Sequence, residues 1–358
     1  MNTIEQLIQE KAYSLGYEKC GIVPMIELQG YGERLEERLR KLPASGQMYD
    51  RHRRLVNPLE SYPWARSVVV LVNHYGKYKI PEHLKNRIAR YYLVDHRDDE
   101  NTAEYKNNRI MEEFMEGLGL RIAGDSKFGI VGLRFAAMQA GLGIVRRNNF
   151  FYTESGSWVN IEAWLTDRDM KLTEKTEIPP CPKGCNLCIR SCPTGSLCEP
   201  FTMLPNTCIS YLTTYGGRNL TAEPLRNTFQ KCIYGCDICQ EVCPMNKGKW
   251  EETEEFPGLE EIAPYLTPEM ILDMGEEFYK TRIQPKFFYL SPDDLWKWKI
   301  NVLVYMKNNY EERYKSYILS ACSNSHEKIR EMAQLLCEEL NLTNNCHSGT
   351  GEAYDTRI

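Results

Sequence analysis

The sequence predicts an α+β fold in which a mixed helix-and-strand domain precedes a cysteine-rich domain and a helical C-terminal region. Strand-like and helix-like periodicities alternate over the first 170 residues. Ten of the 14 cysteines lie between residues 181 and 243, and apolar residues recur at helical spacing over 293–340. A chain of 358 residues is long enough for two or three such domains, each with its own core.

The first predicted domain covers residues 1–172. Helical stretches flank the extended segment CGIVPM within the first 45 residues. The clearest strand is SVVVLVNHY at 67–75, because a continuous run of β-branched residues favours a strand. Beyond it, apolar spacing predicts in turn a helix, a strand, a second helix and an alternating strand, over 102–119, 120–125, 129–142 and 157–167.

Three further segments follow. Residues 173–249 open with a proline-bearing linker and hold the clustered cysteines. Residues 250–342 begin with a stretch, 250–277, that has ten acidic residues and no lysine or arginine, which predicts a solvated acidic face or a linker. Two or three helices are expected over 293–340. The polar tail, 343–358, is expected to be disordered.

Composition indicates a cytoplasmic protein without a membrane partner. The N-terminus lacks the basic and apolar regions of a signal peptide, and the longest strongly apolar run, 68–72, is too short to cross a bilayer. A net charge of −5 gives no overall sign of a nucleic-acid binder. Because cytosol is reducing, clustered thiols there favour metal or redox chemistry over disulfides. Three cysteines outside the cluster are expected to be small buried residues: Cys20, Cys322 and Cys337. Cys346, in the polar tail, is expected to be exposed.

Two cysteine motifs repeat each other: Cys185-x2-Cys188-x3-Cys192-Pro and Cys236-x2-Cys239-x3-Cys243-Pro. Both are close to the bacterial ferredoxin run C-x2-C-x2-C-x3-C-P. Two-residue spacers project thiolates from a tight turn, and the cysteine before proline ligates the other cluster in two-cluster ferredoxins. The motifs therefore predict two [4Fe–4S] clusters. The alternative is zinc, which also uses C-x2-C pairs but usually takes only four ligands.

The ligand set is not fixed by spacing alone, because two clusters need eight ligands and ten cysteines are available. A spacer of three residues, not two, precedes each motif, after Cys181 and after Cys232. On the residues alone, the surplus comes from four candidates: Cys181, Cys198, Cys208 and Cys232.

The segments CISYLT, from Cys208, and YGCDICQEVCPMN, from Tyr234, resemble epoxyqueuosine reductases, which are cobalamin-dependent, two-cluster iron–sulfur enzymes related to reductive dehalogenases. The similarity extends over about residues 1–305, through the segments RRLVNPLESYPWARSVVVLVNHY, RIARYYLVDH, AAMQAGLG and GSWVNIEAWLTD. It implies one cluster held by Cys181, Cys185, Cys188 and Cys243. The other is then held by Cys192, Cys208, Cys236 and Cys239, which leaves Cys198 and Cys232 as non-ligands.

The resemblance also implies a domain plan and a chemistry. The N-terminal domain would be nitroreductase-like and bind base-off cobalamin, the middle domain ferredoxin-like, and the C-terminal segment a short HEAT-like helical array. Electrons from a ferredoxin or flavodoxin would pass through the clusters to cobalt for reductive cleavage of a carbon–oxygen or carbon–heteroatom bond. No histidine ligates cobalt in that family, and His52 and His74 are expected to be structural or surface residues.

Three site assignments follow from the resemblance, each with an alternative. Asp125 matches the aspartate that the family uses as an acid before AGLG, or is an ordinary turn residue. Arg146 and Arg147, in GIVRRN where the family has GWIGKN, would contact a corrinoid amide or an anionic substrate, or form a solvated basic pair. Tyr211, near Cys208, would contact a cofactor or only pack against a cluster.

The substrate stays open at this point. The family acts on epoxyqueuosine in tRNA, whose phosphates demand cations. The acidic stretch disfavours tRNA here, although three lysines leave it possible: Lys297, Lys299 and Lys307. A different small substrate is the other prediction. The rival to an enzyme is a two-cluster electron-transfer or corrinoid-handling protein without a substrate of its own. A redox or iron sensor would need a basic DNA-binding helix pair, which the sequence does not indicate.

Overall fold

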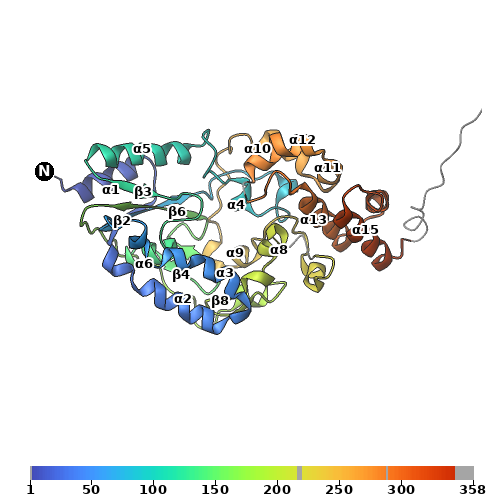
Figure 1. Ribbon diagram of the computed structural model, residues 1–358, viewed down its shortest axis with the longest axis horizontal. Helices are drawn as coiled ribbons and strands as arrows, with labels where there is room; N and C mark the ends of the chain where they lie inside the picture. Colours follow the sequence, from blue (N-terminus) through green and yellow to red (C-terminus); the bar gives the residue numbers. More distant parts are fainter. Residues whose placement is uncertain (1, 216–219, 288, 343–358) are drawn as a thin grey trace, which may run out of the picture. The chain divides into compact units, whose positions relative to one another are not determined.

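The computed structural model describes residues 2–215, 220–287 and 289–342, and they form two compact units (Figure 1). The first unit comprises residues 1–80, 90–208 and 237–260, and the second comprises 81–89, 209–236 and 261 onward. Each unit therefore combines segments that are far apart in the sequence. The predicted mixture of helices and strands is confirmed, while the predicted domain boundaries stay predictions.

A four-stranded antiparallel sheet forms the centre of the first unit. Its order is β1-β2-β6-β3, with bounds β1 Lys19–Pro24, β2 Ser67–His74, β6 Val159–Thr166 and β3 Ile122–Gly124. All four coincide with stretches predicted to be extended. Strand β2 lies between two neighbours and carries apolar side chains on both faces, which explains why its sequence runs SVVVLV without alternation.

The two faces of the sheet bury separate cores. On one face Val69 and Leu71 pack with helices α1, Ile4–Ser14, and α5, Ala103–Gly117. On the other, Val68, Val70 and Val72 pack with α6, Leu133–Gln139. Figure 1 shows α5 and α1 on one side of the strands and α6 on the other. Thr3 begins α1 with a capping box, since its side chain accepts from the Gln6 N–H and the Gln6 side chain accepts from the Thr3 N–H.

Short elements complete the first unit on the α6 side of the sheet and around the cysteines. Helices are α2 Gly30–Lys41, α3 Gly46–Asp50, the 3-10 turn η3 Arg51–Leu55, α4 Arg90–Leu93, α7 Leu187–Arg190 and α9 Ile238–Glu241. Two small hairpins pair β4 Ile144–Val145 with β5 Phe151–Tyr152, and β7 Leu197–Glu199 with β8 Thr202–Met203. Helix α2 also contributes Leu35 to a small core with Leu42 and Tyr49.

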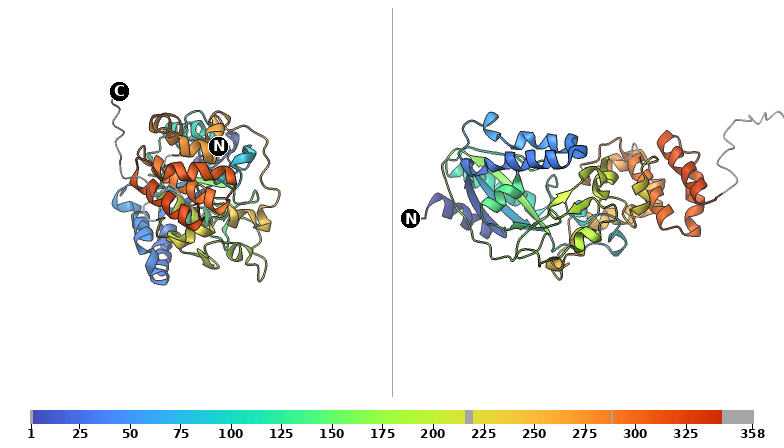
Figure 2. Two further views of the ribbon diagram at one scale, coloured as in Figure 1. Left: turned by 90° about the vertical axis from the view of Figure 1, so that its right-hand side faces the viewer. Right: turned by 90° about the horizontal axis from the view of Figure 1, so that it is seen from below.

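The second unit is mainly helical. Its helices are α8 Ile209–Tyr215, α11 Pro268–Asp273, α12 Glu276–Phe278, α13 Leu295–Asn308, α14 Lys315–Ala321 and α15 Glu327–Glu339. Helix α13 packs against α11 and α15 (Figure 2), and its Trp298 is fully buried among Tyr234, Tyr279 and Phe287. Helix α10, Leu259–Ile262, lies where the acidic stretch passes from one unit to the other.

Some apolar residues of the acidic stretch 250–277 are buried, although the stretch was expected to be a solvated face or a linker. Leu266 and Ile271 are fully buried, so part of this segment belongs to a packed core. No helix in the described ranges is both long and apolar enough to span a bilayer. The predicted disordered tail, with Cys346, lies outside the described residues.

Candidate functional site

Four predicted cluster ligands line one small cavity in the first unit: Cys181, Cys185, Cys188 and Cys243. The three-residue spacer after Cys181 is taken up by a turn. Gly184 adopts the left-handed conformation with φ 75°, and the Cys185 N–H donates to the Pro182 carbonyl at 3.0 Å. Helix α7 then presents Cys188, and Cys243 comes from the chain just before the 3-10 turn at Pro244–Asn246.

The electrostatics of this cavity reflect the convergence of thiols. Burial raises the pKa of Cys188, and the neighbouring thiols of Cys243, Cys181 and Cys185 raise it further by like-charge repulsion. A bound cationic iron centre would relieve this repulsion and keep the sulfurs ionised. Within the described ranges, no three histidine, cysteine, aspartate or glutamate side chains converge on a single-ion site. The four thiols instead surround a space, which suits a cluster.

The second predicted set divides between the two units. Cys192, Cys208 and Cys239 belong to the first unit, and Cys236 belongs to the second. This ligand set therefore stays a prediction. Of the two predicted non-ligands, Cys198 is exposed on β7 and Cys232 is buried in the second unit.

Arg146 and Arg147 lie against the cysteine cavity. Arg146 is only 2% exposed, so it is not part of a solvated basic pair. Its Nη2 donates to the Pro179 carbonyl at 2.8 Å, and its Nη1 lies 4.0 Å from the Cys181 Sγ. Arg147 donates to the Cys185 carbonyl. Both guanidinium groups thus hold the loop that carries the first two cysteines.

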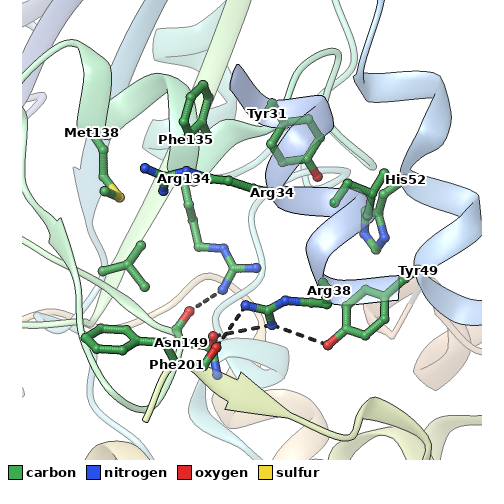
Figure 3. Close-up of a pocket in the computed structure, with 12 residues that line it drawn as sticks. Tyr31, Arg34, Arg38, Tyr49, His52, Arg134, Phe135, Met138, Asn149 and Phe201 are labelled. Carbon is green, nitrogen blue, oxygen red and sulfur yellow. Dashed lines mark hydrogen bonds between the residues drawn. The ribbon is translucent and has the colours of Figure 1, made fainter. Parts of the chain in front are cut away.

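A larger cavity, here called the arginine cavity, lies between helices α2 and α6, has a volume of about 360 Å³ and opens to solvent (Figure 3). Its lining includes Tyr31, Arg34, Arg38, Tyr49, His52, Arg134, Phe135, Asn149 and Phe201. Arg34 and Arg38 are one turn apart on α2, and Arg134 lies in the first turn of α6. No aspartate or glutamate is among the described residues that line this cavity.

The three arginines converge from two helices. Arg134 donates to the Asn149 carbonyl, and Arg38 Nη2 donates to the Phe201 carbonyl at 2.8 Å. The Arg34 guanidinium stacks over Phe135, 4.8 Å from the ring centroid. Arg34 and Arg134 are exposed and Arg38 is half-buried, so the cavity is a cationic space that opens to solvent.

Two polar atoms of the same cavity lack a partner. The His52 Nδ1 and the Asn149 Nδ2 are buried and make no hydrogen bond. Burial lowers the pKa of His52, and the Arg134 charge lowers it further, which favours the neutral imidazole. Unsatisfied buried polar atoms are costly, so their presence beside a cavity indicates a ligand with polar groups. His52 therefore lies in the cavity wall, and the expectation that it is a structural or surface residue stays a prediction.

A second cavity of about 300 Å³, here called the loop cavity, shares Tyr31, His52, Arg134 and Phe135 with the arginine cavity. Phe128 and Val131 reach it from the loop 125–131, which follows β3. Asp125 opens this loop but does not itself line the cavity. Its Oδ1 accepts from the N–H groups of Lys127 and Phe128, at 3.1 and 2.9 Å. Its Oδ2 lies 3.6 Å from the Arg54 Nη1.

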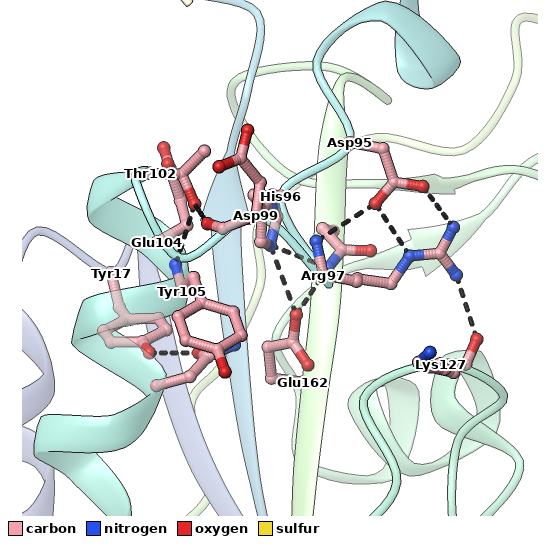
Figure 4. Close-up of polar contacts among 12 residues, drawn as sticks. Tyr17, Asp95, His96, Arg97, Asp99, Thr102, Glu104, Tyr105, Lys127 and Glu162 are labelled. Carbon is pink, nitrogen blue, oxygen red and sulfur yellow. Dashed lines mark hydrogen bonds and ion pairs between the residues drawn. The ribbon is translucent and has the colours of Figure 1, made fainter. Parts of the chain in front are cut away.

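The loop is tied to a buried polar network (Figure 4). Arg97 pairs with Asp95 at 2.6 Å and donates from Nη1 to the Lys127 carbonyl at 2.9 Å, while Lys127 Nζ pairs with Asp98 at 2.9 Å. In the same network the His96 Nε2 lies 3.4 Å from Glu162. Asp95, His96, Arg97 and Asp98 come from the end of the segment RIARYYLVDH and its continuation, whereas Lys127 belongs to the loop and Glu162 to β6. Arg97 thus anchors the loop at Lys127, two residues beyond Asp125.

One short segment separates the cysteine cavity from the arginine cavity. Val145 and Asn149 line the arginine cavity, while Arg146, Arg147 and Asn148 line the cysteine cavity. Asn148 also donates from Nδ2 to the Cys239 carbonyl at 3.0 Å and to the Tyr152 hydroxyl at 2.8 Å. The segment 145–149 is therefore a shared wall, fixed from both sides. Tyr211 lies elsewhere, on α8 of the second unit, where its ring is 5.4 Å from that of Tyr215.

Comparison with known proteins accounts for the cysteines first. Residues 181–246 match the family described as "4Fe-4S double cluster binding domain". Epoxyqueuosine reductase of Listeria monocytogenes is 36% identical over 137 residues, and that of Lactococcus garvieae is 32% identical over 187. These matches cover 37% and 49% of this chain and only 35% and 50% of the relatives' own length. The epoxyqueuosine reductase of Leadbetterella byssophila is 30% identical over 271 residues, 72% of this chain and 84% of that protein.

Solved structures agree on the fold. An epoxyqueuosine reductase crystallised with an epoxyqueuosine-modified tRNA stem loop gives a TM-score of 0.72 at 23% identity, covering 92% of this chain and 88% of that one. The Bacillus subtilis enzyme, captured with its catalytic aspartate loop swung out of the active site, also gives 0.72, at 22% identity and with 92% and 88% coverage. Because the similarity to the Leadbetterella protein spans most of its length, this chain belongs to the epoxyqueuosine reductase family of oxidoreductases.

Proposed function

We propose that the protein is a cobalamin-dependent reductase with two [4Fe–4S] clusters that cleaves a carbon–oxygen bond, and that epoxyqueuosine in tRNA is the first substrate to test. The observation that carries the proposal is the shared wall at 145–149. It separates a cavity lined by four thiols from a cavity large enough for an organic cofactor. Such a wall keeps the two sites within one short segment of each other, which supports electron transfer from a cluster to a ligand.

The arginine and loop cavities are the proposed corrinoid site because they adjoin and share four lining residues. Their volumes of about 360 and 300 Å³ lie at the lower end of the usual range for small-molecule pockets, and both open to solvent, so a corrinoid would fill them and extend from their mouths. The unpartnered His52 Nδ1 and Asn149 Nδ2 suit the amide groups that surround a corrin ring. No histidine ligation of cobalt is needed. When bound, cobalamin would supply a low-potential cobalt centre for the reductive step.

The chain's own residues would hold and tune these groups. Cys181, Cys185, Cys188 and Cys243 would bind one cluster, and Arg146 would place a positive charge near the Cys181 sulfur, which favours the thiolate. The other cluster is proposed for Cys192, Cys208, Cys236 and Cys239. A ferredoxin or flavodoxin is the proposed electron donor. Tyr211 stays a candidate contact near the second cluster, because it follows Cys208 by three residues.

Asp125 is the proposed general acid, which would give its proton to the leaving oxygen. Two observations support it: its loop lines the loop cavity through Phe128, and the Bacillus subtilis relative is described with its catalytic aspartate loop in a swung-out position. Asp125 here points to Arg54 and to its own loop, so a movement of the loop would be needed to bring the carboxyl into the cavity.

The substrate is a separate question from the reaction, and the lysines of the second unit bear on it. A relative has been crystallised with a modified tRNA stem loop. In this chain, however, the lysines that would support RNA binding are engaged: Lys297 pairs with Asp294 at 2.8 Å, and Lys307 with Glu339 at 3.4 Å. Burial lowers the pKa of Lys299. A small epoxide-bearing nucleoside is therefore the second substrate to test.

The proposal is tested by anaerobic reconstitution with iron, sulfide and cobalamin, followed by metal analysis of the desalted protein. About eight irons and one cobalt per chain are expected for two four-iron clusters and one corrinoid. Eight irons without cobalt would overturn the reductase proposal in favour of a two-cluster electron carrier. Zinc in place of iron would overturn the clusters as well. With both cofactors bound, turnover of the modified stem loop is then compared with turnover of the free nucleoside.

A further inference from the structure

We propose that Arg34, Arg38 and Arg134 form a subsite for a phosphodiester group, and that in the resting holoprotein this group is the one in the nucleotide tail of the bound corrinoid. The inference rests on the proposed function for the identity of the ligand. The subsite itself rests on the charges of the arginine cavity.

The cavity concentrates positive charge without compensation. None of the three guanidinium groups has an aspartate or glutamate oxygen within 4.0 Å among the described residues, and none of the cavity's lining residues is acidic. Arginine is always protonated in proteins. By contrast, neighbouring cations on the same face are paired, such as Arg53 with Glu36 and Lys41 with Glu199. Three cations that line one cavity repel each other, and a bound anion would reduce that repulsion.

The protein contacts of these arginines leave several of their N–H donors available. Arg38 donates to the Phe201 carbonyl, the Tyr49 hydroxyl and the Asn149 Oδ1, and Arg134 donates to the Asn149 carbonyl. Among the described residues, Arg34 stacks on Phe135 and donates no hydrogen bond. Arg34 and Arg134 both keep accessible surface in the cavity. Figure 3 shows the Arg38 and Arg134 side chains directed toward the same point, near Asn149 and Phe201. The remaining N–H groups can therefore face a ligand from two helices at once.

The number and kind of donors favour a phosphodiester over a carboxylate. Guanidinium forks match phosphate oxygens in pairs, and two tyrosine hydroxyls and the Asn149 amide lie in the same wall. Four oxygens around one phosphorus can accept from several directions, whereas the two of a carboxylate lie in one plane. In cobalamin the phosphodiester of the nucleotide tail is the anionic group, while the ring side chains are neutral amides. An RNA backbone carries the same group, so the experiment must separate these two sources.

The test compares cobalamin with cobinamide, a corrinoid that lacks the nucleotide tail and its phosphodiester. Both are titrated into the iron–sulfur-reconstituted protein by absorbance, with the same axial ligand. We expect cobalamin to bind at least roughly tenfold more tightly, because charge-assisted hydrogen bonds each contribute about that factor. Arg34→Gln and Arg38→Gln should weaken cobalamin binding roughly tenfold each and leave cobinamide binding unchanged.

Arg40→Gln is the matched control, since Arg40 is an exposed arginine of the same helix α2 and does not line the cavity. It should alter neither affinity. Arg34→Gln has only a stacking contact to lose, and thermal melting of each variant checks that the fold is retained. A third arm measures binding of an unmodified tRNA anticodon stem loop to the same variants.

The outcomes separate the subsite from the function. Weaker binding of the stem loop alone would keep a phosphodiester subsite but assign it to RNA, which overturns the corrinoid-tail part. If cobalamin and cobinamide bind equally and the variants change nothing, the subsite is overturned while the cobalamin-dependent function stands. If neither corrinoid binds the wild-type protein, the proposed function falls and the corrinoid-tail inference falls with it.

Discussion

Arg97 offers the sharpest test of how the Asp125 loop is held. Its side chain is 7% exposed and that of Asp95 is 4% exposed, and the two are joined by contacts of 2.6 and 2.9 Å. The same guanidinium reaches the Lys127 carbonyl at 2.9 Å, two residues beyond Asp125. Arg97→Gln removes the charge that balances a buried carboxylate and one anchor of the loop.

The expected cost follows from burial. Removing one partner of a buried ion pair typically costs about 3–5 kcal/mol, because the other charge stays desolvated. Glutamine can still donate one hydrogen bond, so about 3 kcal/mol is the expectation here. The control is Asp98→Asn, which breaks the more exposed pair of Lys127 and Asp98, whose side chains are 49% and 32% exposed, and keeps Lys127 as a trypsin site. That pair should contribute less than about 1 kcal/mol.

The assay is urea denaturation of the reconstituted protein followed by tryptophan fluorescence, combined with limited trypsin digestion. In Arg97→Gln the loop should open more often, so cleavage after Lys127 should accelerate at urea concentrations where the rest of the protein stays folded. If Arg97→Gln has wild-type stability and a wild-type rate of cleavage at Lys127, the buried network does not hold the loop and this reasoning is refuted.

Three further predictions address the clusters, the acid and the cavity. Cys181→Ser should halve the bound iron, to about four atoms per chain, while Cys198→Ser should leave it at about eight, measured after identical reconstitution; equal iron in both variants would contradict the assignment. Asp125→Asn should lower turnover by about 10²–10⁴-fold without changing cobalamin affinity. Asp169→Asn, a change at an exposed position, should change neither turnover nor cobalamin affinity. Because folding lowers the pKa of His52 below its usual 6.5, the unfolded chain binds more protons as pH falls, so stability should decrease from pH 7 to pH 5, and the decrease should be smaller in His52→Gln. An identical pH dependence of the urea midpoint in the wild-type protein and in His52→Gln would refute this pH prediction.

Local periodicity was sufficient for the elements that form the sheet. Strand β2 could be predicted because both of its faces are buried, which leaves an unbroken β-branched run. Strand β3 is only three residues long, Ile122–Gly124, because it pairs with β6 only over these residues. The strand expected over 120–125 is therefore longer than the observed one. The four thiols of the cysteine cavity were predicted only through the family resemblance, because spacing alone left the surplus ligands open among Cys181, Cys198, Cys208 and Cys232.

The arginine cavity was beyond sequence reasoning for a physical reason. Arg34 and Arg38 are spaced by four residues in GYGERLEERLRK, the pattern of an ordinary solvent-facing helix with acidic neighbours. Only the long-range approach of α6, the β4–β5 hairpin and Phe201 encloses them and excludes carboxylates from the wall. The one available signal was the basic composition of 34–54, which has no matching acidic partner at Arg34 or Arg38.

Net charge therefore says little about what this protein binds, because the cations of its two units differ in whether they pair with carboxylates. In the second unit the lysines and arginines mostly face carboxylates close in sequence, as in the pairs Lys297–Asp294 and Lys315–Glu312. The Lys315–Glu312 pair is exposed and the Lys297–Asp294 pair is half-buried; both cancel their own long-range field, so they are weak attractors for phosphate. In the first unit the arginine cavity has no carboxylate among its described lining residues to compensate its charge. Anion recognition is thus expected to act on one ligand group at short range, and a nucleic-acid substrate would have to be recognised mainly through its modified base.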